Sequence, residues 1–128
     1  MINDFEFLQE FRLLKGVLND IKNKENFISL SEREIQREIQ GDAANAGFFS
    51  LMNSDSPGAS NSPGYDLQII GLRTNFFLEV KKDDKKIRTE NLLRPSQKLF
   101  RIKAKVANKK NIRYLVVVYR GKKIEISE

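Results

Sequence analysis

The chain opens with apolar residues that recur at steps of three and four positions. In residues 5–21 these are Phe7, Phe11, Leu14, Leu18 and Ile21. The spacing puts them on one face of an amphipathic helix. We interpret this helix, within residues 1–24, mainly as part of the core. A role in dimerisation is the alternative that the pattern leaves open.

A second helix is predicted after a polar break at residues 22–26. Ser31 is typical of an N-cap, and Glu34 stands where a capping box has its acid. Gly47 suits the end of the helix. The following segment, residues 50–64, is rich in Ser, Asn, Pro and Gly, which predicts a loop.

Two apolar runs, residues 65–71 and 75–81, then predict a β-hairpin with its turn near residues 72–74. The second run alternates. Because side chains alternate across a strand, one face receives Phe77, Glu79 and Lys81. The other face receives Phe76, Leu78 and Val80.

The rest of the chain predicts one more helix and two more strands. Pro95 opens the helix, and residues 96–110 continue it with an apolar stripe of Leu99, Ile102 and Val106. Residues 112–120 read as a buried central strand and residues 123–127 as a short last strand. The order α-α-β-β-α-β-β predicts an α/β (α+β) domain, a central mixed sheet flanked by helices. The helical crossover between the second and third strands predicts that these two are parallel.

Composition narrows the possible chemistry. The 128 residues suit one domain, and they include no Cys and no His. Thiol nucleophiles, imidazole bases and Cys or His metal ligands are therefore excluded. Catalysis has to use carboxylates, Lys, Tyr or a metal held by oxygen atoms. The net charge of +6 favours a polyanionic partner.

Nothing in the sequence indicates a membrane protein. No apolar run approaches the ~20 residues of a spanning helix. The acidic start MINDFEF differs from a signal peptide. We expect a cytoplasmic protein with no membrane partner.

The hairpin carries the most specific chemistry. It brings Asp66, at the start of its first strand, close to Glu79 near the end of its second, with Lys81 on the same face. Two crowded carboxylates repel each other unless a cation lies between them, and such oxygen ligands suit Mg²⁺ or Mn²⁺. The alternative is that Glu79 and Lys81 form an ordinary salt bridge on a solvated face.

Asp66 followed by Glu79-Val80-Lys81 resembles the signature of the PD-(D/E)XK nucleases. Within residues 31–119 the chain looks most like small VRR-NUC domains and archaeal Holliday-junction resolvases. Glu32 in SEREIQREI matches their upstream helical glutamate, and Gln97 in RPSQKLF matches a Gln that opens the next helix. Tyr65 departs from the pattern, because the signature usually has Pro before the Asp.

The resemblance implies a restriction-endonuclease-like core and a role for each matched residue. Asp66, Glu79 and the Val80 backbone carbonyl would hold the metal, and Glu32 would reach it directly or through water. Lys81 would position the nucleophile. Gln97 would orient Lys81 or contact the scissile phosphate. Glu34 is the alternative to Glu32, although its capping-box position favours a structural role.

Basic residues around this site offer contacts to phosphates. The candidates for nucleic-acid binding are Lys82, Lys85, Lys98, Arg101 and Lys105. Each of them on its own is equally well explained as part of a solvated face.

We therefore expect a Mg²⁺- or Mn²⁺-dependent DNA endonuclease that either prefers branched DNA or cleaves DNA without sequence specificity. We expect it to act as a homodimer and to take no small-molecule substrate. One alternative is a sequence-specific or end-trimming nuclease of the same fold. Another is an inactive basic module that binds nucleic acid. A structural or toxin–antitoxin-type interaction protein is the last alternative, which only the small size favours.

Overall fold

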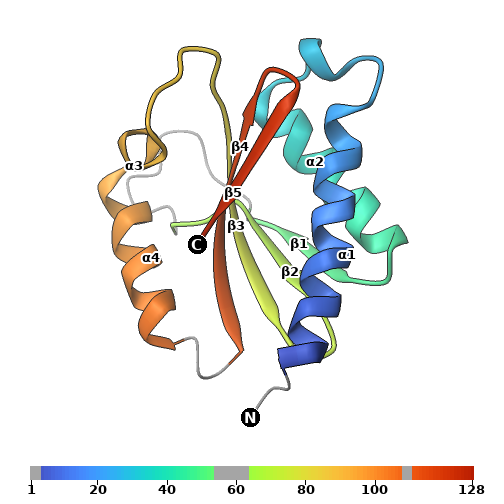
Figure 1. Cartoon of the computed structure of the whole chain (residues 1–128), viewed down its shortest axis with the longest axis vertical. Coiled ribbons are helices and arrows are strands. Elements are labelled where there is room, and N and C mark those ends of the chain that lie inside the picture. Colours follow the sequence, from blue (N-terminus) through green and yellow to red (C-terminus); the bar gives the residue numbers. More distant parts are fainter. Residues whose placement is uncertain (1–3, 54–63, 108–110) are drawn as a thin grey trace.

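The computed structural model describes residues 4–53, 64–107 and 111–128, with side chains from residue 8 onward. Within them the chain forms an α+β domain, in which four α-helices pack against a five-stranded mixed sheet (Figure 1). The helices are α1 (Asp4–Lys22), α2 (Glu32–Asn45), α3 (Thr89–Leu92) and α4 (Pro95–Val106), with a 3₁₀ turn η1 (Phe27–Ser29) before α2. The strands are β1 (Phe49–Met52), β2 (Leu67–Ile70), β3 (Asn75–Lys82), β4 (Ile112–Arg120) and β5 (Lys123–Ser127).

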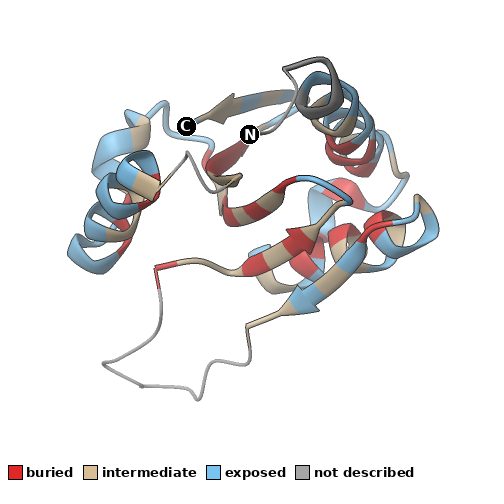
Figure 2. Cartoon of the chain, turned by 90° about the horizontal axis from the view of Figure 1, so that it is seen from below, coloured by how far each residue is buried: buried red, intermediate tan, exposed pale blue. Residues whose placement is uncertain are grey.

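Helices α1 and α2 cover one face of the sheet (Figure 1), and the buried residues of both helices belong to the core cluster on that face (Figure 2). Leu14, Leu18 and Ile21 of α1 are fully buried there, so the interpretation of this stripe as core is confirmed. Phe7 lies outside the described side chains. Helix α2 begins with the predicted capping box between Ser31 and Glu34.

The strands lie in the sheet in chain order, β1 to β5. β2 and β3 form the predicted antiparallel hairpin, in which Leu67 is opposite Leu78. β3 and β4 are parallel, as the crossover predicts, and β5 is antiparallel to β4. Residues Tyr114 to Tyr119 of β4 are all buried, which confirms a central strand.

Helix α4 covers the other face, but it does so with a different side from the predicted one. Leu99, Ile102 and Val106 are 53%, 61% and 79% exposed, so the apolar stripe identified in the sequence does not face the core. The helix instead turns Gln97 and Ala104 inward, and Phe100 packs beside them. The physical reason is a buried hydrogen bond from Gln97 to Glu79, described below.

One strand and one α-helix were not predicted, and neither was the 3₁₀ turn η1. Residues 50–52 belong to strand β1, which pairs with β2, although the composition of residues 50–64 predicts a loop. β1 is short and its Phe49 and Leu51 are exposed, so it carries no buried apolar face. The charged connection after β3 contains the one-turn helix α3. Residues 54–63 of the predicted loop and 108–110 of the predicted helix lie outside the described residues.

None of the helices in the described ranges is long and apolar enough to cross a membrane.

Candidate metal and phosphodiester site

The β2–β3 hairpin places Asp66 beside Glu79. The Asp66 backbone N–H donates to the Leu78 carbonyl at 2.8 Å, which fixes the start of β2 against β3. The Val80 N–H then donates to Asp66 Oδ2 at 2.8 Å. The Asp66 side chain thus accepts a hydrogen bond from β3 where a backbone carbonyl would otherwise do so. This arrangement confirms the predicted proximity of Asp66 and Glu79.

Glu79 is a buried carboxyl group, 2% exposed. Its Oε1 accepts from Gln97 Nε2 at 2.5 Å and lies 3.3 Å from Lys81 Nζ. Its Oε2 is buried and has no hydrogen-bond donor among the described residues. Because a buried carboxylate oxygen without a donor is costly, the Glu79 carboxyl group either keeps a proton that it shares with the Asp66 side chain or needs a cation beside it.

Gln97 is held so that its amide group points at Glu79. Its Oε1 accepts from the Arg94 N–H at 2.8 Å, which leaves Nε2 as the donor toward Glu79. The side chain is fully buried. The sequence predicted a contact with Lys81 or with the substrate, whereas in the structure Gln97 orients Glu79.

The electrostatics of the site follow from burial and from crowding. Burial, reinforced by the charge of Asp66, raises the pKa of Glu79 to about 8, although Lys81 acts in the opposite direction. Burial also raises the pKa of Asp66. Near neutral pH, therefore, Glu79 carries a proton when no cation is bound.

Tyr114 adjoins this pair but is not available for proton transfer. Burial, together with the nearby charges of Glu79 and Asp66, raises the pKa of its hydroxyl group. The hydroxyl group donates to the Gly64 carbonyl at 2.7 Å. It therefore anchors the chain two residues before Asp66.

Gly64 is a positioning residue, although in the sequence it is only one of the residues of a predicted loop. A Cβ atom at this position would lie 2.5 Å from Phe100 Cβ and 2.7 Å from the Ser96 carbonyl oxygen. Only glycine lets the chain pass this close to α4. The sequence signal was the Gly just before Tyr65-Asp66, but composition alone does not separate it from the other loop glycines.

Glu32 lies at the edge of this site rather than inside it. Its Oε1 accepts from the Lys82 N–H at 2.9 Å, and its charge acts on the pKa of Asp66. Within the described ranges, no three acidic side chains gather closely enough to form a metal site by themselves. Glu34 is committed to its capping box with Ser31.

The backbone edge of β3 supplies one more oxygen atom. Asn75 and Asp83 turn their N–H groups toward β4, so the even-numbered residues of β3 face away from it. On that side the Val80 and Lys82 N–H groups are bonded by Asp66 and Glu32. The Val80 carbonyl therefore lies on the open edge between these two carboxylates.

Two carboxylates and one carbonyl at an open strand edge fit a hard divalent cation. Asp66, Glu79 and Val80 offer only oxygen atoms, and among the described residues no N–H or O–H group of another residue donates to Glu79 Oε2. Mg²⁺ and Mn²⁺ prefer such ligands and usually keep several water molecules. A cation there would also lower the repulsion that raises the pKa of Glu79.

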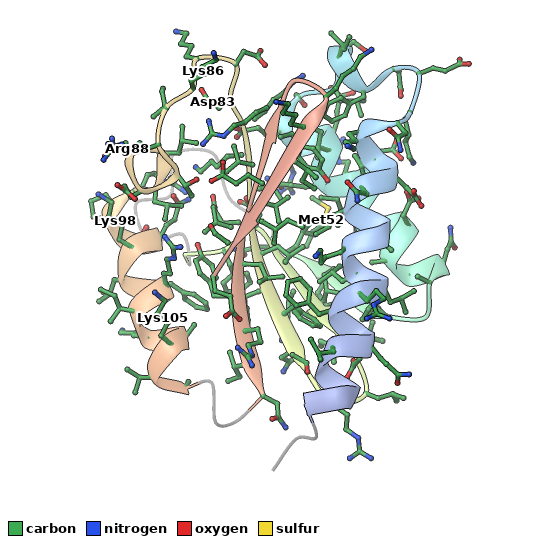
Figure 3. All side chains as sticks on the ribbon, in the orientation of Figure 1. Met52, Asp83, Lys86, Arg88, Lys98 and Lys105 are labelled. Carbon is green, nitrogen blue, oxygen red and sulfur yellow. The ribbon has the colours of Figure 1, made fainter. Side chains whose placement is uncertain are left out.

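The structure distributes the predicted basic residues unevenly. Lys98 and Lys105 project from α4 into solvent (Figure 3), and Lys85 is also exposed. Lys82 Nζ instead donates to the carbonyl groups of Ile28 and Leu30, on the other side of the sheet. Arg101 is half-buried and donates to the Glu128 carbonyl.

Comparison of the chain with models of protein families, with curated proteins and with solved structures found no match. What the site does must therefore follow from its own residues.

Proposed function

We propose that the protein is a Mg²⁺- or Mn²⁺-dependent endonuclease of the PD-(D/E)XK type, with a restriction-endonuclease-like core, that hydrolyses phosphodiester bonds in DNA. The observation that carries this proposal is the convergence of Asp66, Glu79, Lys81 and Gln97, with Glu79 Oε2 buried and without a donor in the described structure. A salt bridge on a solvated face does not account for it, because Glu79 is 2% exposed.

Asp66, Glu79 and the Val80 carbonyl would hold the cation, with Glu32 close enough to bond one of its water molecules. A divalent cation supplies polarisation of a phosphoryl oxygen and a lowered pKa for a bound water. Asp66 and Glu79 are held in place before any ligand arrives, by the Val80 N–H and by Gln97. Such preorganisation reduces the cost of forming the charged site.

Lys81 is the residue of this set that can reach the substrate. Its Nζ lies 3.3 Å from Glu79 Oε1, and its side chain is 16% exposed. In the proposed reaction the ammonium group orients the attacking water and neutralises the charge that develops on the phosphate. Hydrolysis then forms one phosphorus–oxygen bond to water and breaks the bond to the leaving strand.

The substrate class follows from size and charge. A chain of 128 residues with net charge +6 binds the phosphate backbone more readily than it reads base edges. We propose DNA structure, such as a four-way junction, as the basis of selectivity. Action on a junction by paired sites needs a homodimer.

The proposal of a homodimer with paired active sites can be tested separately. The apolar residues Leu14, Leu18 and Ile21 of α1 are buried within the chain, so α4, with Leu99, Ile102 and Val106 exposed, offers the larger free apolar face. Light scattering at micromolar concentration is expected to give a dimer. A monomer would leave the nuclease proposal intact but remove the paired-site version.

The nuclease proposal is tested by cleavage of labelled DNA. A four-way junction, linear duplex and single strand are incubated with Mg²⁺, Mn²⁺ or EDTA, using the wild type, Glu79→Ala and the exposed control Glu25→Ala. We expect metal-dependent cleavage by the wild type and the control, and none by Glu79→Ala. DNA binding without cleavage, equal in all three proteins, would indicate a basic DNA-binding module instead of an enzyme.

A further inference from the structure

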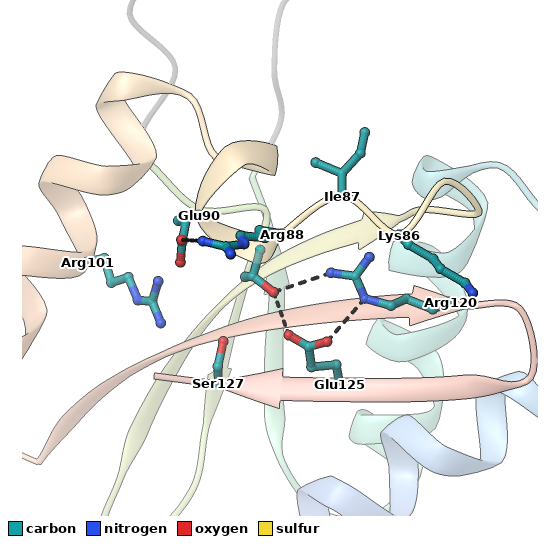
Figure 4. Close-up of a pocket in the computed structure, with 9 residues that line it drawn as sticks. Lys86, Ile87, Arg88, Glu90, Arg101, Arg120, Glu125 and Ser127 are labelled. Atoms are coloured by element: carbon teal, nitrogen blue, oxygen red, sulfur yellow. Dashed lines mark hydrogen bonds and ion pairs between the residues drawn. The ribbon is translucent and has the colours of Figure 1, made fainter.

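A second polar pocket lies on the same face of the sheet as Glu79 and Lys81. It has a volume of about 500 Å³ and lies between α3, α4 and the β4–β5 hairpin (Figure 4). This volume is within the range of small-ligand pockets. Four cationic and two acidic side chains line it: Lys86, Arg88, Arg101, Arg120, Glu90 and Glu125.

The three arginines of the pocket differ in how far they are already engaged. Arg120 is already engaged, because it pairs with Asp83 and donates to Glu125 at 3.1 Å. Arg101 donates to the Glu128 carbonyl through Nε and Nη2, which leaves Nη1 for another partner. Arg88 is 81% exposed and pairs only weakly, at 3.9 Å, with Glu90.

The floor of the pocket carries a hydroxyl group that lacks a partner. Ser127 Oγ is buried and has no hydrogen-bond partner in the described parts of the chain. Figure 4 shows it below the space between Arg101 and Arg120. Thr89 does not serve it, because the Thr89 hydroxyl donates to Glu125 at 2.5 Å. A bound acceptor would therefore satisfy Ser127 and meet the free donors of Arg88 and Arg101.

The sheet register relates this pocket to the candidate catalytic pair. Glu79 is opposite Val116 on β4, and Val116 is opposite Ser127 on β5. Strands are spaced about 4.8 Å apart, so Ser127 lies roughly 10 Å from Glu79 across the sheet. Phosphates of one strand of B-DNA rise by about 3.4 Å per nucleotide along the helix axis and are further apart along the strand itself, so this separation corresponds to at most about three nucleotides.

We propose that this pocket binds a phosphate group of the DNA strand that is cut at Glu79 and Lys81, a few nucleotides from the cleaved bond. The inference rests on the proposed function. Arginine favours phosphate over other anions because its planar fork makes paired hydrogen bonds to phosphate oxygens. In this arrangement Arg88 and Arg101 donate to the phosphate from above, and Ser127 donates from the floor.

The test measures binding without cleavage, by fluorescence anisotropy of a labelled single-stranded oligonucleotide in EDTA over a range of salt concentrations. The variants are Ser127→Ala and Arg88→Gln, with Arg12→Gln on α1 as a control that removes an equal charge from an exposed position on the opposite face. Thermal melting of each variant checks that the fold is kept. Free mononucleotide and inorganic phosphate serve as competitors.

We expect Ser127→Ala and Arg88→Gln each to weaken binding by about five- to tenfold, and Arg12→Gln to leave it within about twofold. Arg88→Gln should also lower the slope of log affinity against log salt by about 0.7, the value for one contact to a single strand. Wild-type affinity and slope in both pocket variants would overturn the inference. So would a mononucleotide that binds as tightly as the oligonucleotide, because it would assign the pocket to a free nucleotide.

These outcomes separate the two proposals. Cleavage by the wild type together with unchanged binding by the pocket variants would contradict only the proposal that the pocket binds a phosphate. Pocket-dependent binding of the oligonucleotide without metal-dependent cleavage of any substrate would contradict the nuclease proposal. It would also contradict the proposal that the pocket binds the strand that is cut.

Discussion

Glu79 combines burial with a neighbouring acid, and the two effects act on its proton in the same direction. Its one paired oxygen accepts from Gln97 and lies near Lys81, while the other has no donor in the described structure. Burial and Asp66 together raise the pKa of Glu79 to about 8. The folded protein therefore keeps a proton that the unfolded chain loses near an ordinary glutamate pKa.

This difference predicts how stability depends on pH in EDTA. Between the ordinary pKa of 4.5 and about 8 the folded state binds more protons than the unfolded state, so the free energy of unfolding falls as pH rises. Asp66, whose pKa is also raised, adds to the fall at lower pH. Urea unfolding across this window should show the decline in wild type and a flatter profile in Glu79→Gln. An equal slope in both proteins would contradict the assignment.

Substitution of Lys81 should lower the cleavage rate without weakening metal binding, for which the carboxylates are needed. Lys81→Met removes the ammonium group near Glu79 but none of the proposed ligands. Because a like charge beside the cation is removed, Mn²⁺ affinity should stay the same or rise. The cleavage rate should fall by at least about 100-fold, the low end for loss of a general acid–base or charge-stabilising group. Cleavage within a few-fold of wild type would show that Lys81 has no part in the reaction.

At the level of residues, the sequence located part of the site. Asp66 and Glu79 were predicted to be neighbours because a hairpin with a short turn fixes which residues are opposite each other, and they are neighbours in the structure. The partner of Gln97 could not be predicted, because the angle of α4 about its own axis decides which side chain points inward. Gly64 was missed because its importance comes from the closeness of Phe100 and Ser96.

At the level of elements, α4 shows a polar contact overriding an apolar pattern. Gln97 is fully buried, whereas Leu99 and Ile102 are exposed. Phe100 packs in a cluster of rings with Tyr65, Phe77 and Tyr114, at centroid distances of 5.2 to 5.3 Å. The orientation of the helix thus satisfies Glu79 and this ring cluster at once.

Substitutions along α4 test this orientation. Leu99→Ala should cost at most about 0.5 kcal/mol in the free energy of unfolding, since the side chain is exposed. Phe100→Ala should cost about 3 kcal/mol, because it leaves a gap among packed rings. Urea unfolding of both variants measures the difference. The opposite order would mean that α4 packs with its predicted stripe.

Most elements followed from periodicity, and the exceptions have physical reasons. α1, α2, β3 and β4 have long or strongly alternating patterns, which tertiary contacts seldom override. β1 has four residues, none of which is buried, so its pairing with β2 rather than an apolar pattern defines it. α3 has a single turn without buried residues.

At the level of the whole molecule, the proposed chemistry gathers on one face of the sheet. Glu79, Lys81 and the arginine-lined pocket all lie on the α3–α4 side, whereas the basic residues of the other side are partly engaged. Lys24, for instance, pairs with Glu38 and Asp42. The positive charge available to a polyanionic partner therefore lies mainly on the α3–α4 side, which carries both the Glu79–Lys81 site and the pocket.

The Asp66–Glu79 pair is tested as a metal site by calorimetric titration of Mn²⁺ into the metal-free protein near pH 7, in two buffers of different ionisation enthalpy. The wild type should bind Mn²⁺ at the Asp66–Glu79 pair with release of close to one proton, since Glu79 starts protonated. Glu79→Gln should lose both the binding and the proton release, and Glu25→Gln should keep them. Equal Mn²⁺ binding by wild type and Glu79→Gln, or none by either, would contradict the claim that this pair is a metal site.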